Sequence, residues 1–149
     1  MCHQDPTQTA AAHQQRTRIF LAEDDKEMRG LVASVLRRSG HEVVEAADGL
    51  ELLRQIESVD ELESEACRDL VVTDVRMPGA TGLEVLASLR QSRPNVPVVL
   101  VSSFGDEELR ADARQLGAAA FLDKPFSLAA LQTTILQLSA WPANNNGAT

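Results

Sequence analysis

Cysteine and histidine are scarce in this sequence, and neither is arranged as a site. The two cysteines, Cys2 and Cys67, lack the CxxC spacing of metal and redox motifs. The three histidines, His3, His13 and His41, are scattered along the chain. The pattern therefore predicts neither a zinc site nor a nucleophilic triad, and we interpret both cysteines as bystanders.

Long apolar runs and an excess of basic residues are also missing. No run approaches the roughly 20 residues that a membrane helix needs, and the first residues lack the basic and apolar regions of a secretory signal. The 22 acidic residues outnumber the 14 basic ones, for a net charge of -8. Because phosphate backbones are held chiefly by lysine and arginine clusters, we expect a cytoplasmic protein that binds neither membranes nor nucleic acid directly.

The length of 149 residues fits one domain with a substantial core. The composition, 44% hydrophobic and 24% charged, is ordinary for a globular protein. Residues 1–16 and 141–149 are polar and lack periodicity, so we expect a disordered tail at the first end and a loose tail at the second. The predicted folded domain is 17–140.

Short apolar runs alternate with helical patterns five times along this domain. Because the strand runs are too uniformly apolar for a sheet with one wet face, the sequence predicts an α/β fold in which helices cover both sides of a parallel sheet. The expected strands are 18–22, 42–47, 69–74, 97–102 and 119–124. The expected helices are about 28–36, 49–59, 82–93, 106–116 and from 127 onward.

One connection is unusually long. Residues 58–69 (SVDELESEACRD) carry five carboxylates, where connections of about 2 to 6 residues are usual. A solvated surface excursion is the favoured interpretation, and a binding element is the alternative.

Polar residues follow four of the predicted strands. In an open parallel sheet, ligands bind outside the carboxyl ends of the strands, so these side chains are expected near one another. Any one of them is more often a helix cap or turn former, but clustered carboxylates would raise one another's pKa unless a cation lay among them. Oxygen ligands favour Mg²⁺. The residues are Glu23, Asp24 and Asp25, then Asp74, then Ser102 and Ser103, and finally Lys124 before Pro125.

The segments AEDD, VVTDVRMPG, VLVSS and FLDKPF, in this order, resemble the receiver domain of two-component response regulators, which include the chemotaxis response regulator. The resemblance covers roughly residues 17–140. It implies a flavodoxin-like, doubly wound sheet with strand order 2-1-3-4-5 and five helices. It also implies a phosphoacceptor signalling switch in a phosphorelay, which catalyses its own phosphorylation and dephosphorylation but is not a conventional enzyme.

The resemblance assigns a role to each strand-end residue. Asp74 matches the phosphoacceptor, and Lys124, followed by an expected cis bond to Pro125, matches the lysine that pairs with the phosphoryl group. Ser102 matches the hydroxyl that turns toward that group, and Phe121 the aromatic that moves inward in response. A plain core aromatic remains the alternative for Phe121, which lacks the hydroxyl of the tyrosine found there in some members.

The same resemblance implies a Mg²⁺ site. Asp24 is expected to bind the ion directly and Glu23 through water, together with Asp74 and the main-chain carbonyl of Arg76. The other register, Asp24 with Asp25, is disfavoured because Asp25 would cap the following helix.

Two positions are expected to set the lifetime of the phosphate: Arg76 and Phe104. A polar or acidic residue there would help to orient the hydrolytic water, and this chain has a cation and an apolar ring instead. The sequence therefore predicts slow autodephosphorylation.

The implied partners are a sensor histidine kinase or histidine phosphotransfer protein, and an output protein that binds the surface of the fourth helix, fifth strand and fifth helix. Two other functions fit the sequence less well. A haloacid dehalogenase needs a second aspartate where Arg76 stands, and a flavin-binding module needs a phosphate loop where EDDKE would repel a phosphate. Within the family, a receiver acting alone is favoured over the receiver portion of a truncated DNA-binding regulator.

Overall fold

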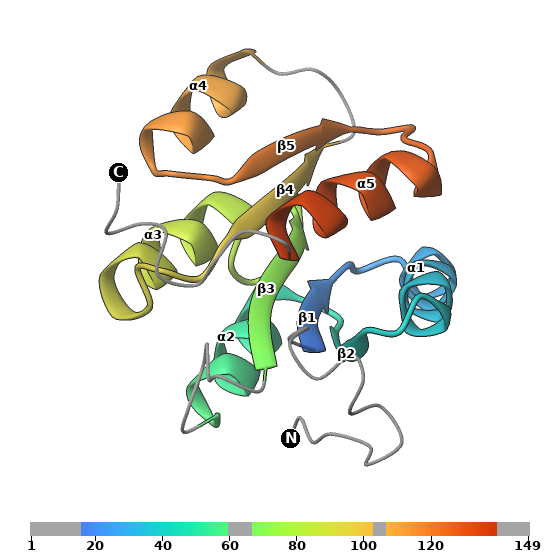
Figure 1. Ribbon diagram of the computed structural model, residues 1–149. Coiled ribbons are helices and arrows are strands. Elements are labelled where there is room, and N and C mark those ends of the chain that lie inside the picture. The colour runs from blue at the N-terminus through green and yellow to red at the C-terminus, as the bar shows by residue number, and fades with distance from the viewer. Residues whose placement is uncertain (1–15, 60–66, 103–106, 140–149) are drawn as a thin grey trace.

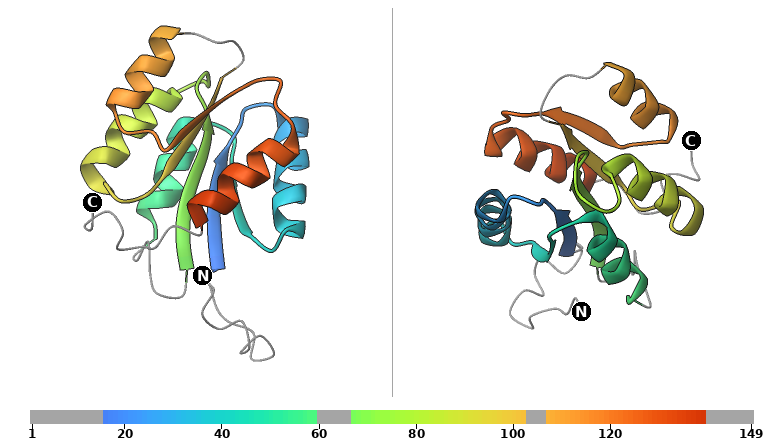
Figure 2. Two further views of the ribbon diagram at one scale, coloured as in Figure 1. Left: turned by 45° about the horizontal axis from the view of Figure 1, so that its top comes forward. Right: turned by 180° about the vertical axis from the view of Figure 1, so that it is seen from behind.

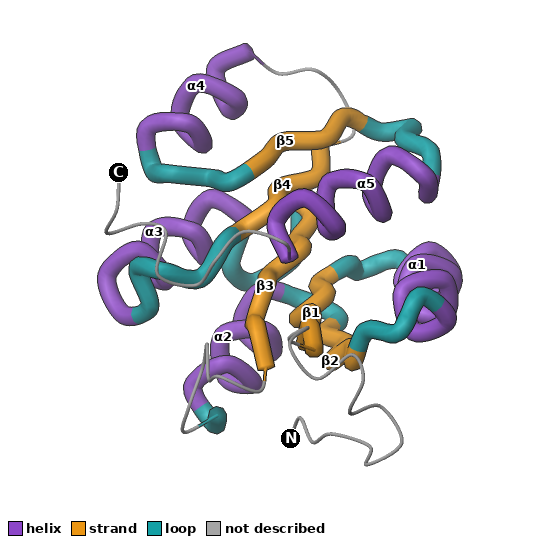
Figure 3. The backbone as a smooth tube through the Cα atoms, viewed as in Figure 1, coloured by secondary structure: helices purple, strands orange, loops and turns teal. Residues whose placement is uncertain are grey.

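The computed structural model describes residues 16–59, 67–102 and 107–139. They form one parallel sheet of five strands in the order β2-β1-β3-β4-β5, with five helices, which confirms the predicted fold class (Figures 1 and 3). The strands are β1 (Arg16–Ala22), β2 (Glu42–Ala46), β3 (Cys67–Asp74), β4 (Val98–Ser102) and β5 (Ala120–Asp123). The helices are α1 (Lys26–Arg38), α2 (Gly49–Glu57), α3 (Gly82–Ser92), α4 (Glu107–Gln115) and α5 (Leu128–Ser139).

The helices lie on both faces of the sheet. Helices α1 and α5 cover one face, and α2, α3 and α4 cover the other (Figures 1 and 2). Successive strand residues point to opposite faces, so Val71 joins the core under α2 and α3, whereas Val72 joins the core under α1 and α5. Burial on both sides explains why the strand runs are uniformly apolar. Within the described residues, no helix is long and apolar enough to cross a membrane.

Side-chain caps define where the first three helices begin. Asp25 caps α1 and Asp48 caps α2, each accepting a hydrogen bond from a first-turn backbone N–H. Thr81 and Glu84 form a reciprocal capping box at the start of α3. Such caps satisfy backbone donors that have no partner within the helix. Each of these helices therefore starts at a defined residue just beyond the carboxyl edge of the sheet.

Two strands begin earlier than the sequence predicts. β1 starts at Arg16, which was assigned to the tail, and β3 starts at Cys67, inside the predicted connector. The two strands pair in register through these added residues, with Arg18 opposite Asp69. The Arg18 Nε lies 2.5 Å from Asp69 Oδ1 in a buried ion pair. The start of β3 is therefore buried through polar residues, which an apolar pattern does not detect. The connector therefore ends before residue 67, so its extension over 67 and 68 is wrong, whereas 60–66 lies outside the described residues.

Candidate functional site

Residues from separate strands meet at the carboxyl edge of the sheet. Glu23 and Asp24 follow β1, and Asp74 ends β3. Because Ala22 pairs with Thr73 in the parallel register, the next residues of the two strands lie side by side. One carboxylate oxygen of each of the three acids lies within 4.8 Å of the others. The sheet register itself thus assembles the acidic cluster.

Lys124 reaches this cluster from beyond β5. Its Nζ donates to Glu23 Oε1 at 2.9 Å and to Asp74 Oδ2 at 3.0 Å. Strand β4 separates β5 from β3, so a long side chain is needed to span the distance. The Lys124–Pro125 peptide bond is cis. One ammonium group therefore bridges two of the three carboxylates.

The charges of the cluster are incompletely balanced. Burial raises the pKa of the Glu23 carboxyl; the hydrogen bonds from Lys124 and from the Asp25 backbone oppose this rise, and the nearby Asp74 charge adds to it. For Lys124, burial alone would lower the pKa, but the hydrogen bonds and charges of Glu23 and Asp74 outweigh it and raise the pKa. The site thus stabilises a positively charged group at Lys124 and disfavours the ionised form of Glu23.

The turn after β1 is held from α1. Asp24 is exposed, whereas the Asp25 Oδ1 accepts a hydrogen bond from the Met28 N–H at 3.0 Å as the cap of α1. The Arg29 Nη1 donates to the main-chain oxygen of Glu23 at 2.9 Å. Capping occupies the Asp25 carboxylate, which leaves Glu23 and Asp24 as the acids of this turn that face Asp74.

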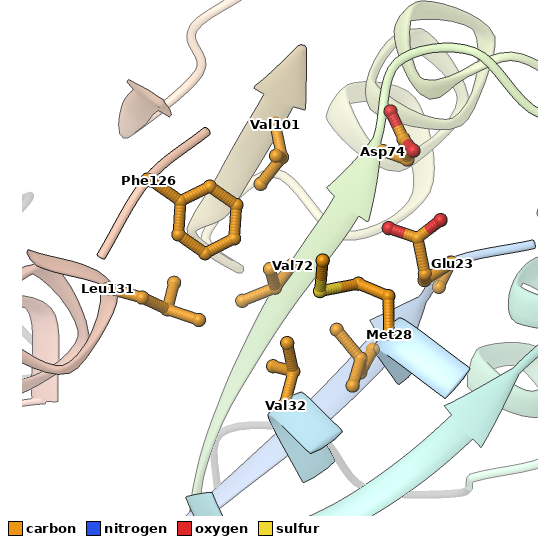
Figure 4. Close-up of a pocket in the computed structure, with 10 residues that line it drawn as sticks. Glu23, Met28, Val32, Val72, Asp74, Val101, Phe126 and Leu131 are labelled. Atoms are coloured by element: carbon orange, nitrogen blue, oxygen red, sulfur yellow. The ribbon is translucent and has the colours of Figure 1, made fainter. Parts of the chain in front are cut away.

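A small cavity lies beneath the carboxylates (Figure 4). Its volume is about 10 Å³, close to the smallest space that holds one water. The Glu23 and Asp74 carboxylates lie at one end of it (Figure 4). The apolar lining residues include Met28, Val32, Val72, Val101, Phe126 and Leu131. These apolar walls contribute to the burial that raises the pKa of Glu23.

The chain after Asp74 stays close to the strand end. The Arg76 N–H lies 3.4 Å from Asp74 Oδ1, and the Gly82 N–H donates to the Val75 carbonyl at 2.8 Å. A Cβ at Gly82 would lie 2.6 Å from the Asp74 carbonyl oxygen, closer than any side chain tolerates. Gly79 takes the left-handed conformation, with φ +80°. Glycines at these two positions let the turn fold back toward the end of β3.

Arg76 also borders a groove of about 230 Å³ between α3 and α4. The other lining residues are Val75, Thr81, Leu83, Glu108, Leu109 and Asp112.

Ser102 and Phe121 lie on neighbouring strands. Ser102 ends β4 and is almost fully buried, and its main-chain oxygen accepts a hydrogen bond from the Lys124 N–H at 2.5 Å. Phe121 is partly buried against the core under α2, α3 and α4. Phe104 lies outside the described residues. The structure therefore brings Glu23, Asp24, Asp74 and Lys124 together, with Ser102 linked to Lys124 through the backbone.

Sequence reasoning missed two arginines near the site. Arg29 holds the Glu23 carbonyl, and Arg110 of α4 lies over the Phe121 ring, 4.6 Å from its centroid, while also pairing with Asp123. An arginine on a helix is ordinarily solvated, so neither residue stands out in the sequence. Only the relative positions of the helices and strands reveal these contacts.

Comparisons with known proteins agree with this arrangement. A family model described as response regulator receiver domain matches residues 19–136. The transcriptional regulatory protein PdtaR of Mycobacterium tuberculosis is 37% identical over 127 residues, which cover 85% of this chain and 58% of PdtaR. The C4-dicarboxylate transport transcriptional regulatory protein DctD of Pseudomonas aeruginosa is 31% identical over 123 residues, covering 80% of this chain and 24% of DctD.

Solved structures show the same likeness. The chemotaxis response regulator CheY4 of Vibrio cholerae superposes with a TM-score of 0.72 at 25% identity, covering 83% of this chain and 99% of that chain. The match thus covers nearly the whole CheY4 chain. It covers only 58% of PdtaR and 24% of DctD.

Proposed function

The chain belongs to the response regulator receiver family, and on this premise we propose that it is a phosphoacceptor switch of a two-component phosphorelay. A carboxylate oxygen of Asp74 attacks the phosphorus of a phosphohistidine on a sensor histidine kinase or histidine phosphotransfer protein. The P–N bond breaks, the imidazole leaves with the electron pair, and an acyl phosphate forms on Asp74. The observation that supports this proposal is the meeting of Asp74 with two further carboxylates and Lys124 at one edge of the sheet.

The acidic cluster fits a magnesium ion. Three carboxylates supply hard oxygen ligands within 4.8 Å of one another, and Lys124 alone does not balance them. Glu23, Asp24 and Asp74 would hold the ion together with the main-chain carbonyl of Arg76. When bound, Mg²⁺ would neutralise part of the charge of the carboxylates and of the transferred phosphoryl group.

Lys124 and Ser102 would then bind the new phosphoryl group. The Lys124 Nζ lies 3.0 Å from Asp74 Oδ2, so it is within reach of a phosphoryl group on that carboxylate. The Ser102 hydroxyl would donate to a second phosphoryl oxygen. Because β4 and β5 are paired neighbours, a shift at Ser102 would reach Phe121 and change the α4-β5-α5 surface that binds an output protein.

We infer that the phosphate is long-lived. Arg76, two residues past Asp74, is a cation with no acceptor for the proton of a hydrolytic water, and Phe104 at the second position is apolar. The half-life of phosphorylated protein in Mg²⁺ buffer is expected to be minutes or longer, and Arg76→Asn is expected to shorten it. Decay of the wild-type acyl phosphate within seconds would contradict this inference.

The central experiment is labelling with acetyl phosphate or phosphoramidate in the presence of Mg²⁺, followed by mass spectrometry to locate the modification. Wild-type protein is expected to carry one phosphate on Asp74, chelation of the metal to suppress it, and Asp74→Ala to abolish it. Asp112→Asn, a change at an exposed carboxylate of α4, serves as the matched control. An unlabelled wild type, or full labelling of Asp74→Ala, would overturn the proposal.

A second arrangement is a receiver that acts within a longer regulator. The relatives PdtaR and DctD are both longer than this chain and are named as transcriptional regulatory proteins. Size exclusion and a pull-down from the parent cell, each with and without phosphorylation, test the output. Phosphate-dependent dimerisation supports a receiver that pairs with a second copy, and phosphate-dependent capture of a different protein supports a receiver that binds another protein.

A further inference from the structure

Arg110 connects α4 to the outer side of β5 through two contacts. Its guanidinium carbon lies 4.6 Å from the centroid of the Phe121 ring. The same guanidinium forms an ion pair with Asp123. Residues 121 and 123 are two apart on one strand, so their side chains share a face of β5. A single arginine therefore clamps a neighbouring ring and carboxylate of this strand.

Helix α4 buries few of its side chains fully. Ala113 is the only fully buried residue among the described residues of this helix. Glu108 and Asp112 face the groove toward α3, whereas Arg110 reaches β5. The Arg110 side chain is 26% exposed and that of Asp123 is 43% exposed. Leu109 is also partly buried against this core, so the Arg110 contacts add to the apolar packing that holds α4 near β5.

Asp123, which pairs with Arg110, is one residue before Lys124, the residue expected to contact the phosphate. The backbone N–H of Lys124 bonds to the Ser102 carbonyl, and its Nζ touches Asp74. A movement of Lys124 toward a phosphoryl group would pull the strand end that carries Asp123. A movement of Phe121 into the core would withdraw the ring from the guanidinium.

We propose that Arg110 is a positioning residue that holds Phe121 and α4 in the unphosphorylated arrangement, so that activation requires its contacts to be exchanged. This inference rests on the proposed function and concerns the regulation of the same site. A ligand that stabilises one of two states binds more tightly when the opposing state loses a contact. Loss of a cation–π contact at a partly exposed site is expected to shift the balance about threefold toward the active state.

The test is a titration of the full chain with beryllofluoride, a stable phosphoryl mimic, in Mg²⁺, followed by NMR of ¹³C-labelled phenylalanine. Arg110→Gln is expected to bind the mimic about threefold more tightly than wild type. Its unliganded Phe121 signal should also lie closer to the liganded position. Arg114→Gln removes the same charge from the same helix and is expected to match wild type. Arg110→Lys, a conservative change, is expected to give a smaller shift in the same direction.

A double-mutant cycle separates the contact from a general effect on folding. In the Phe121→Ala background, the cation–π contact is gone, so Arg110→Gln is expected to alter affinity much less than in wild type. Equal or weaker binding of the mimic by Arg110→Gln, with an unchanged Phe121 signal, would overturn the inference while leaving the proposed function intact. A wild type that does not respond to beryllofluoride at all would overturn the proposed function and the inference with it.

Discussion

At the scale of single residues, Lys124 links the two buried carboxylates of the candidate site. Its side chain contacts Glu23 and Asp74, whose own side chains are only 8% and 6% exposed. Removing the partner of a buried carboxylate lowers the free energy of unfolding, because water cannot replace the lost hydrogen bond. Lys124 and a bound metal would stabilise the same negative charges, so each is expected to compensate for the absence of the other.

Lys124→Met is therefore expected to lower the free energy of unfolding in metal-free buffer by about 1–2 kcal/mol. Added Mg²⁺ should raise the melting temperature of this variant more than that of wild type. Thermal unfolding followed by circular dichroism, with and without Mg²⁺, measures both effects. Lys26→Met, which removes the chain's other lysine from an exposed position, is the control; an equal Mg²⁺ effect in both variants would contradict the expectation.

His41 supplies a pH-dependent contribution to stability away from the site. Burial lowers the pKa of its imidazole below the ordinary value of 6.5. The unfolded chain therefore binds a proton more readily, and this contribution to stability is lost as pH falls through 6.5 toward the folded-state pKa. Urea unfolding between about pH 7.5 and 6 should show a falling free energy of unfolding for wild type and a flatter profile for His41→Gln. Identical slopes for the two proteins would refute this.

At the scale of the elements, the start of α2 packs closely against the loop that follows the candidate site residue Asp74. Gly49 begins α2, and a Cβ there would lie 2.1 Å from the Ala80 carbonyl oxygen. The loop between β3 and α3 therefore rests directly on the backbone of α2. Gly30 in α1 differs, because a Cβ at that position has nothing within 4 Å. Substitution by alanine is therefore expected to have opposite effects on stability at these two positions.

Gly49→Ala is expected to destabilise the protein by about 1–3 kcal/mol, because the loop must move away from the new methyl group. The same displacement should reduce labelling of Asp74 by acetyl phosphate. Gly30→Ala should stabilise the protein by about 0.5–1 kcal/mol, since alanine loses less backbone entropy in a helix, and should leave labelling unchanged. Denaturant unfolding and the labelling assay together test both; the same sign of stability change in the two variants would be incompatible with the packing described.

At the scale of the whole molecule, a buried structural ion pair and the candidate site lie at opposite ends of one strand. The phosphoacceptor candidate Asp74 ends β3, whereas Asp69 lies five residues earlier on the same strand, about 17 Å away in an extended chain. Asp69 is fully buried and pairs with Arg18 through two hydrogen bonds of 2.5 and 3.1 Å. One end of the strand thus carries a structural ion pair, and the other carries the site.

Asp69→Asn is expected to lower the free energy of unfolding by about 3–5 kcal/mol, because it removes the charge that compensates a buried guanidinium. The folded fraction should still be labelled on Asp74 at the wild-type rate. Chemical denaturation and the rate of phosphorylation at low temperature measure the two properties separately. A loss of labelling rate in protein shown to be folded would contradict the separation.

The amino-acid sequence by itself determined the alternation of strands and helices and the residues at the strand ends. Uniformly apolar strand runs require a sheet buried on both faces, and the carboxyl ends of neighbouring parallel strands must meet, so Glu23, Asp24, Asp74 and Lys124 could be predicted as a group. Local patterns report these features because they arise from apolar burial and from strand direction.

Only the tertiary structure decided where polar residues extend the strands and which helix contacts which strand. Arg18 and Asp69 are buried because they neutralise each other across 51 residues of sequence, so no local pattern signals their burial. The contacts of Arg110 with Phe121 and Asp123 depend on how α4 lies against β5. Hydrophobic periodicity predicts which face of an element is buried, but a contact between charged or aromatic side chains depends on the placement of both elements, which forms only when the chain folds.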